Sequence, residues 1–513
     1  MKSIYTMSKH HKTIIQPFTI HIAEVETDDM EYNVVNPESM AQEEAEMNPL
    51  SENPNAPACP PPNVDKNVYY GAQIHLEDGL RIYEKKIQQS FPEMTLTYPL
   101  IVIHCCDGAI HDNIDRLTSS TIVTSSITFM SKQLLNAGVS PTSPTWILSL
   151  MQIQAKETLP VIRRCLSQHF IDVATITNKF PGKYIFKQLH DGKMQYLITQ
   201  HSAWNRQFQP FLKCDCKRGS LAHPDHCCKQ LTIQDTANLF QKSKMRFEKR
   251  VRMNGLMNPA TKKPFPVYSI AQHRAWADEN NVGITHLGIV PQTFDYSTLA
   301  EDVFHGHCSI IKMVIRHIRH LLVSDYNLLD MGRLLLVSLP HWREYYVDQW
   351  WNGDPLCHLQ GKHIKAFVNN VQIFIDMLQN QLPEFTVRDF VKVLLLCPKI
   401  YNFLGHKHVN QVMIDEYKQD IAEFFPLVYN TFGSQNTPGD KETMYLHAMQ
   451  WYIPQNVQDL FNEFGLGPGI FSMEGFENVN KQSKLLARCS TNKKGNVPKQ
   501  ILSKLLLSFE IQE

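Results

Sequence analysis

The feature that most constrains the fold is the apolar run TYPLIVIHCCDGAI (residues 97–110), in which four large aliphatic residues precede Asp107. A run of this kind is typical of a buried β-strand. The run therefore predicts a central strand that carries a carboxylate to its carboxyl end.

Two further strand-like runs follow, SSTIVTSSITFM (119–130) and PTWILSLMQIQ (144–154). Both are rich in β-branched or aromatic residues, and a stretch with Gly138 and prolines separates them. Such composition favours strands, and the intervening glycine and prolines favour a turn. Three strands in succession predict an antiparallel meander.

A helix and a fourth strand are predicted next. ETLPVIRRCLSQHF (157–170) has apolar residues at helical spacing, and KYIFKQLHDGKMQYLITQ (183–200) has an extended pattern that contains Asp191. The order strand, strand, strand, helix, strand, with an acid closing the first and fourth strands, is the layout of the RNase H fold. The expected fold class is α+β, with a mixed sheet as its core.

The remainder of the chain divides by composition. Residues 28–67 are acidic and then proline-rich, which predicts disorder, and long helical patterns dominate beyond about Thr232. The expected segments are a disordered leader (1–67), the first part of an RNase H-like core (68–205), a Cys/His loop (206–232), a helical insertion (233–465) and the rest of the core with a basic tail (466–513).

Composition excludes some classes of protein. Lysine plus arginine (50) equals aspartate plus glutamate (50), so any nucleic-acid surface must be a local patch. No stretch reaches the roughly 18 uninterrupted apolar residues of a membrane helix, which predicts a soluble protein without a membrane partner. The 12 cysteines lie among helical patterns rather than in a short secreted chain, which indicates reduced thiols and a nuclear or other intracellular location.

Five segments resemble a known family when taken in order: HCCDGAIHD, YIFKQLHDGKM, KCDCKRG, EDVFHGHCS and FSMEGFENVNK. They are similar to segments of the catalytic subunit of the V(D)J recombinase and of the Transib transposases, over roughly residues 69–488. The resemblance implies a DDE-type transposase or recombinase that cuts and joins DNA, in which paired DNA ends imply a homodimer. The alternative is a domesticated relative that keeps the fold and a structural zinc ion but acts as an inactive DNA-binding or scaffold protein.

The resemblance implies that the catalytic acids are Asp107, Asp191 and Glu477. Glu474 is an alternative to Glu477, and Asp302 replaces Asp191 if Asp191 proves remote from Asp107. Two magnesium or manganese ions in phosphoryl transfer need such hard oxygen ligands on both sides of the scissile phosphate. Asp-Gly pairs are also ordinary turn signals after strands, so each aspartate has a purely structural interpretation as well.

A zinc site is the second metal hypothesis. Soft and borderline ligands gather in a short loop, and the resemblance adds His447, which matches the first histidine of the family's zinc site, whereas Tyr452 stands at the second. Bound by four protein ligands, zinc would be structural. The candidate ligands are Cys214, Cys216, His226, Cys227, Cys228 and His447.

Two basic segments are candidate DNA-contact surfaces, KSKMRFEKRVRMNG (242–255) and the stretch just after Glu477. A solvated helix face is the alternative interpretation of the first. The candidate residues are Arg246, Lys249, Arg250, Arg252, Lys481 and Lys484.

Overall fold

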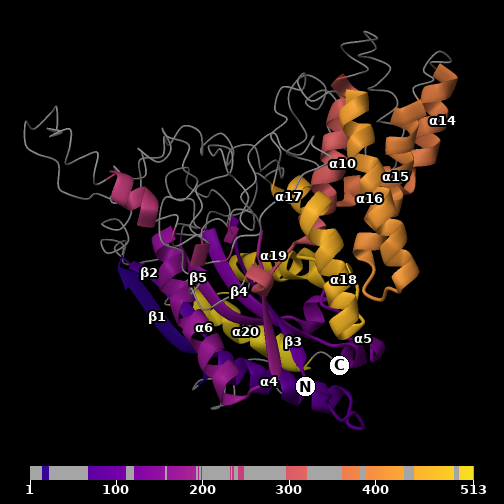
Figure 1. The fold of residues 1–513 in the computed structure, drawn as a ribbon. Helices are drawn as coiled ribbons and strands as arrows, with labels where there is room; N and C mark the ends of the chain where they lie inside the picture. Colours follow the sequence, from indigo (N-terminus) through magenta and orange to yellow (C-terminus); the bar gives the residue numbers. More distant parts are fainter. Residues whose placement is uncertain are drawn as a thin grey trace, which may run out of the picture.

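The computed structural model describes residues 14–21, 68–110, 121–155, 159–191, 194–195, 198, 232, 234–235, 238, 241–247, 296–320, 361–381, 388–432, 444–489, 491 and 496–511. Within these residues the protein is α+β, with a mixed sheet beside a group of helices (Figure 1). The sheet has seven strands in the order β1-β2-β5-β4-β3-β6-β7.

The strands are β1 (Gln16–His21), β2 (Val68–Gln73), β3 (Leu100–Ile110), β4 (Thr121–Met130), β5 (Leu148–Gln154), β6 (Tyr184–Leu189) and β7 (Leu299–Ala300). The helices of the sheet domain are α4 (Leu76–Ser90), α5 (Lys132–Asn136), α6 (Leu159–Lys179), α19 (Glu474–Cys489) and α20 (Val497–Ile511). The other helices are α10 (Val303–His320), α13 (Gly361–Asn369), α14 (Val371–Gln381), α15 (Arg388–Gly405), α16 (Gln411–Phe432), α17 (Met444–His447) and α18 (Ile453–Phe464). Four short helical turns complete the description, η1 (Pro144–Trp146), η4 (Tyr296–Thr298), η7 (Ala448–Tyr452) and η8 (Pro468–Phe471).

The predicted meander is confirmed. β3 pairs antiparallel with β4 from Ile101 opposite Met130 to Ile110 opposite Thr121, and β4 pairs antiparallel with β5. These strands are buried on both faces, which explains why their sequences lack the strict apolar–polar alternation of strands with one exposed face.

The predicted crossover helix is confirmed, but the extended segment expected over 183–200 is a strand only at Tyr184–Leu189, and residues 194–195 and 198 are helical. α6 follows β5, and the chain returns in β6, which lies parallel to β3. β7 then adds a short strand parallel to β6. Because β3, β6 and β7 run in one direction, their carboxyl ends lie at the same edge of the sheet.

Helices cover both faces of the sheet. On one face, α4 and α6 contact each other, and Gly79 of α4 lies so close to Leu148, Leu150 and Ile127 that a Cβ atom there would be 2.5 Å from Leu150 Cδ2. On the other face, α19 contacts β3 and β4, and α20 contacts β2 and β5. The sheet is therefore the middle layer of three.

The helices from α10 to α18 enclose an apolar core of their own, distinct from the core around the sheet. α15 packs along α16. Figure 1 shows this group beside the sheet, at the edge where β3, β6 and β7 end. Among the described residues, no helix has the length and apolar character that a membrane crossing requires.

Strand β1 was missed by the sequence analysis, because it lies inside the segment 1–67 that was expected to be a disordered leader. It pairs antiparallel with β2 at the edge of the sheet. The strand is short, and the neighbouring acidic composition hid its pattern.

Candidate functional site

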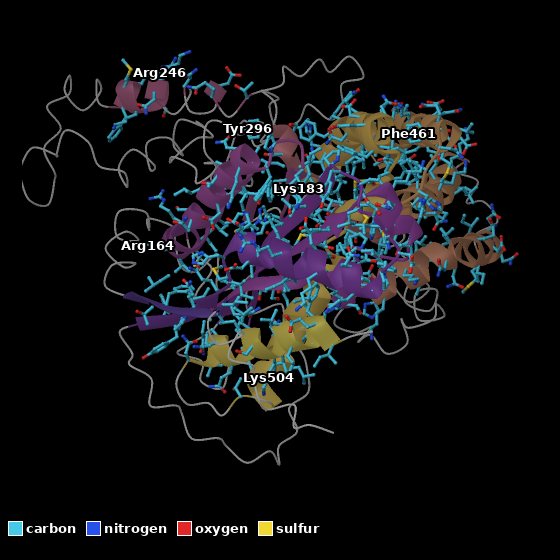
Figure 2. The ribbon with its side chains drawn as sticks, turned by 90° about the horizontal axis from the view of Figure 1, so that it is seen from below. Arg164, Lys183, Arg246, Tyr296, Phe461 and Lys504 are labelled. Carbon is cyan, nitrogen blue, oxygen red and sulfur yellow. The ribbon has the colours of Figure 1, made fainter. Side chains whose placement is uncertain are left out.

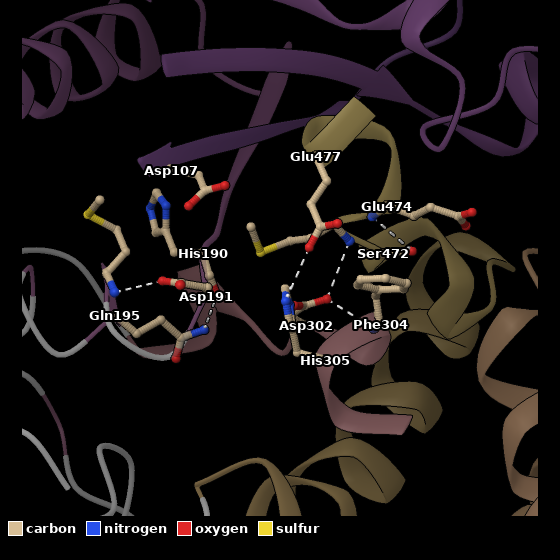
Figure 3. A network of polar contacts seen from close by, with 12 residues as sticks. Asp107, His190, Asp191, Gln195, Asp302, Phe304, His305, Ser472, Glu474 and Glu477 are labelled. Atoms are coloured by element: carbon tan, nitrogen blue, oxygen red, sulfur yellow. Dashed lines mark hydrogen bonds and ion pairs between the residues drawn. The ribbon is translucent and has the colours of Figure 1, made fainter. Parts of the chain in front are cut away.

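Three aspartates lie at the shared carboxyl edge of the sheet. Asp107 stands near the end of β3, Asp191 follows β6, and Asp302 follows β7 at the start of α10. Figure 3 shows the three carboxylates together with Glu477, which α19 brings from the far end of the chain. The topology therefore gathers acids from four separate segments at one place.

Asp302 is buried, and its carboxylate is held on several sides. Oδ1 accepts hydrogen bonds from the backbone N–H of Phe304 at 2.9 Å and of Met473 at 3.3 Å. Oδ2 accepts a hydrogen bond from Nδ1 of His305. The Met473 contact ties the start of α10 to the residue that immediately precedes α19.

His305 bridges two of the acids. While Nδ1 contacts Asp302, Nε2 lies 3.2 Å from Oε1 of Glu477. Burial by itself lowers the pKa of His305, but the carboxylates of Asp302 and Glu477 outweigh it and raise that pKa well above its usual value. A protonated imidazole between two carboxylates offsets part of their mutual repulsion.

Helix α19 also reaches the first aspartate. The side-chain amide of Asn480, one turn beyond Glu477, donates a hydrogen bond of 2.6 Å to Oδ2 of Asp107. Since a carboxylate only accepts hydrogen bonds, the nitrogen of the amide must face it. Glu474, in contrast, is exposed and turns away from Glu477 (Figure 3), so the structure favours Glu477 over Glu474 as the acid of this group.

Asp191 has a local partner in addition to its position in the group. Its Oδ1 accepts a hydrogen bond of 2.8 Å from the backbone N–H of Met194. The amide of Gln195 donates to the carbonyl of His190 at 3.0 Å and to that of Ala300 at 3.4 Å, which joins the ends of β6 and β7. Asp191 is therefore not remote from the other acids.

The negative charges of the four acids affect the pKa of two buried thiols. Burial raises the pKa of Cys105 well above its usual value, and the charges of Asp107, Asp302 and Asp191 raise it further. Burial likewise raises the pKa of Cys308 to about 12, with a contribution from Glu477. Both thiols are therefore held in the neutral form, mainly by burial, and the nearby carboxylates act in the same direction.

The donor set suits a hard cation. Aspartate and glutamate oxygens are the ligands that Mg²⁺ and Mn²⁺ prefer. Within the described residues, no three His, Cys, Asp or Glu side chains already lie at a spacing that closes on one ion. The carboxylates would have to turn toward one another to share a metal.

The zinc hypothesis falls mostly outside the described residues. Cys214, Cys216, His226, Cys227 and Cys228 all belong to that undescribed part of the chain. His447 is described; it is fully buried at the end of α17, and its ring packs edge-to-face on Tyr452 at 5.1 Å between centroids.

The candidate DNA-contact residues are scattered. Lys481 is exposed and Lys484 half-buried on α19, next to the acids, whereas Arg246 is exposed at the periphery, on the side of the molecule away from Lys504 (Figure 2). Lys249, Arg250 and Arg252 lie outside the described residues.

Sequence reasoning assigned no role to two polar residues of the site, His305 and Asn480. Both were visible in the quoted segments EDVFHGHCS and FSMEGFENVNK, three residues after Asp302 and three after Glu477. Because residues three apart share one face of a helix, this spacing was the signal that could have identified them.

The sequence matches no protein-family model, and no curated protein matches it.

Proposed function

We propose that this protein cleaves and joins DNA strands in a metal-dependent reaction, as DDE transposases and recombinases do, on an RNase H-like core. The observation that carries the proposal is the convergence of Asp107, Asp191, Asp302 and Glu477 at one edge of the sheet. The strand order β5-β4-β3-β6-β7, with α6 between β5 and β6, supports the RNase H-like assignment.

Asp107, Asp302 and Glu477 are the proposed metal ligands. Asp107 lies on a central strand, and Asp302 and Glu477 are joined through His305. Asp191 is not remote from Asp107, so Asp302 is preferred on another ground: its carboxylate is linked to Glu477 through His305, and to the backbone before α19. Asp191, which is also at this edge, is the alternative that the mutants below distinguish.

Magnesium ions bound by these carboxylates would activate water or a 3′-hydroxyl and would stabilise the leaving oxygen. The protein's own groups orient the ligands. Asn480 holds one oxygen of Asp107, and His305 and the Met473 amide hold Asp302. Pre-set ligand directions reduce the reorganisation that the reaction requires.

A lysine on α19 is a candidate contact for the DNA backbone. Lys481 is exposed on the turn of α19 that follows Glu477. Lysines at such positions bind phosphates without reading sequence, and the strength of their binding falls as salt rises. Lys481 is the proposed phosphate contact nearest to the carboxylates.

The test is nicking and strand transfer on supercoiled DNA with Mg²⁺ or Mn²⁺. Asp107→Asn, Asp302→Asn and Glu477→Gln should each abolish the products, whereas Glu474→Gln, at an exposed position on the same helix, should retain them. An Asp191→Asn variant as inactive as Asp302→Asn would make Asp191 a ligand too. Products that persist in Asp107→Asn would refute the proposed site.

A second candidate function has one observation in its favour. His305 contacts both Asp302 and Glu477, and their charges raise its pKa well above the usual value, so a protonated His305 offsets part of their repulsion without a cation. In that case the protein is a domesticated DNA-binding or scaffold protein. DNA binding that persists in the absence of any metal-dependent product, in either metal, would favour this function.

A further inference from the structure

Asp107 belongs to a row of side chains that crosses the sheet. It lies directly opposite Thr124 of β4, and Thr124 lies directly opposite Gln152 of β5. Directly paired residues point to the same face of a sheet, so the three side chains share the face that α19 covers. Thr124 is 3% and Gln152 0% exposed. This buried surface is therefore polar along one line.

A chain of hydrogen bonds runs from this row into α19. The hydroxyl of Thr124 donates to Oε1 of Gln152 at 3.3 Å, and the Gln152 amide donates to Oγ of Ser483 at 3.2 Å. The Ser483 hydroxyl, which is 1% exposed, donates in turn to the carbonyl of Val479 at 3.0 Å. Each buried polar side chain in this series of hydrogen bonds thus has a partner.

The contacts of α19 are spaced three residues apart. Glu477 contacts His305, Asn480 contacts Asp107, and Ser483 contacts Gln152. Residues three apart are neighbours on one side of a helix. Asn480 contacts β3, and Ser483 contacts β5, which lies on the far side of β4. Because both side chains belong to one helix, a contact that fixes Ser483 over the sheet also fixes Asn480.

Polar contacts of this kind allow one position of the helix. If α19 slid or rotated, the buried amide of Gln152 would lose its partner on Ser483, and an unsatisfied buried amide is strongly unfavourable. A purely apolar contact would tolerate such movement far better. The Gln152–Ser483 contact therefore selects the position of α19 at which Asn480 contacts Asp107 and Glu477 contacts His305.

We propose that Thr124, Gln152 and Ser483 are positioning residues that hold α19 in place so that Glu477 and Asn480 reach the candidate metal ligands. The inference rests on the proposed function, since it concerns the ligands of that same site. None of the three residues contacts the metal or the DNA in this scheme; they act through α19.

The sharpest test compares Ser483→Thr with Ser483→Val in the full chain. The two variants have the same shape and differ only in the hydroxyl, so any effect of the added methyl group is common to both. Gln152→Met removes the same hydrogen bond from the other side. Ser126→Ala is the matched control, because the Ser126 hydroxyl is buried in the same sheet and contacts Ser149 at 3.2 Å.

Two measurements are needed, Mn²⁺ binding by titration calorimetry and amide hydrogen exchange of residues 474–489. We expect Ser483→Val and Gln152→Met to bind Mn²⁺ at least about tenfold more weakly than Ser483→Thr, as supporting residues of metal sites generally do. Exchange in residues 474–489 should accelerate in the same two variants. Ser126→Ala should behave like the wild-type protein in both measurements.

Equal Mn²⁺ affinity of Ser483→Thr and Ser483→Val would overturn the positioning role and leave the proposed function standing. A loss in Ser126→Ala as large as that in Ser483→Val would overturn it too, because any buried hydroxyl would then have the same effect. Wild-type protein that binds no Mn²⁺ would overturn the proposed function and, with it, the role of these residues in a metal site.

Discussion

The buried histidine His104 makes the stability of the sheet depend on pH. It is 0% exposed on β3, and its ring stacks on His169 of α6 with centroids 3.6 Å apart. Nδ1 lies 2.6 Å from Oε1 of Gln188 and donates to it, which leaves Nε2 to accept from the Ser125 hydroxyl at 2.8 Å. The neutral imidazole is thus fully satisfied. Burial lowers the pKa of His104 to about 4, although the contact with Gln188 opposes the shift.

The expected loss of stability follows from the difference between the pKa of His104 in the folded chain and in the unfolded chain. In the unfolded chain His104 has a pKa of about 6.5, so the unfolded state binds a proton that the folded state refuses between roughly pH 6.5 and 4. The stability is complete above that window and is lost as pH falls through it. Between pH 8 and pH 5 the loss from His104 alone is about 2 kcal/mol. His169, whose pKa burial lowers well below its usual value, adds a loss of the same sign.

Urea unfolding followed by circular dichroism at pH 8 and pH 5 measures this loss. His104→Leu should lower stability at both values, because Gln188 and Ser125 lose a buried partner. The free energy of unfolding of this variant should nevertheless change less between pH 8 and pH 5 than that of the wild-type protein, by about 2 kcal/mol. His408→Gln, at an exposed position, is the control and should leave the difference unchanged. A His104→Leu variant with the full wild-type pH dependence would refute the reasoning.

Three further predictions concern how α19 and the helical region are attached to the sheet. Gly475→Ala should destabilise the protein by about 2 kcal/mol in urea unfolding, because its Cβ would be 2.6 Å from the backbone oxygen of Pro141. Lys407→Met should cost about 1 kcal/mol in the same assay, since Nζ donates a 2.6 Å hydrogen bond to Ser140 across the two parts of the molecule. Asn480→Leu, which removes the amide held against a proposed ligand, should slow metal-dependent nicking at least about tenfold while circular dichroism stays unchanged.

The sheet was predictable where local pattern and burial agree. The runs that became β3, β4 and β5 are rich in apolar or β-branched residues, as strands buried on both faces are. β7 has only two residues, too few to produce a pattern, and it was not predicted. Asp302 was placed after Asp191 as a candidate because the resemblance puts its segment downstream of the second metal ligand, and nothing in the local sequence shows that Asp302 follows a strand.

The sequence by itself determined the strands β3 to β6, the long helices and the acids at the ends of two of those strands, because periodicity and turn chemistry are local properties. Only the tertiary structure decided which acids are neighbours. Asp302 and Glu477 are far apart in the chain, and they meet through His305 because β7 aligns with β6 while α19 returns over β3. Such a meeting depends on long-range packing, in which a buried polar row selects one position of a helix, and no local pattern encodes that choice.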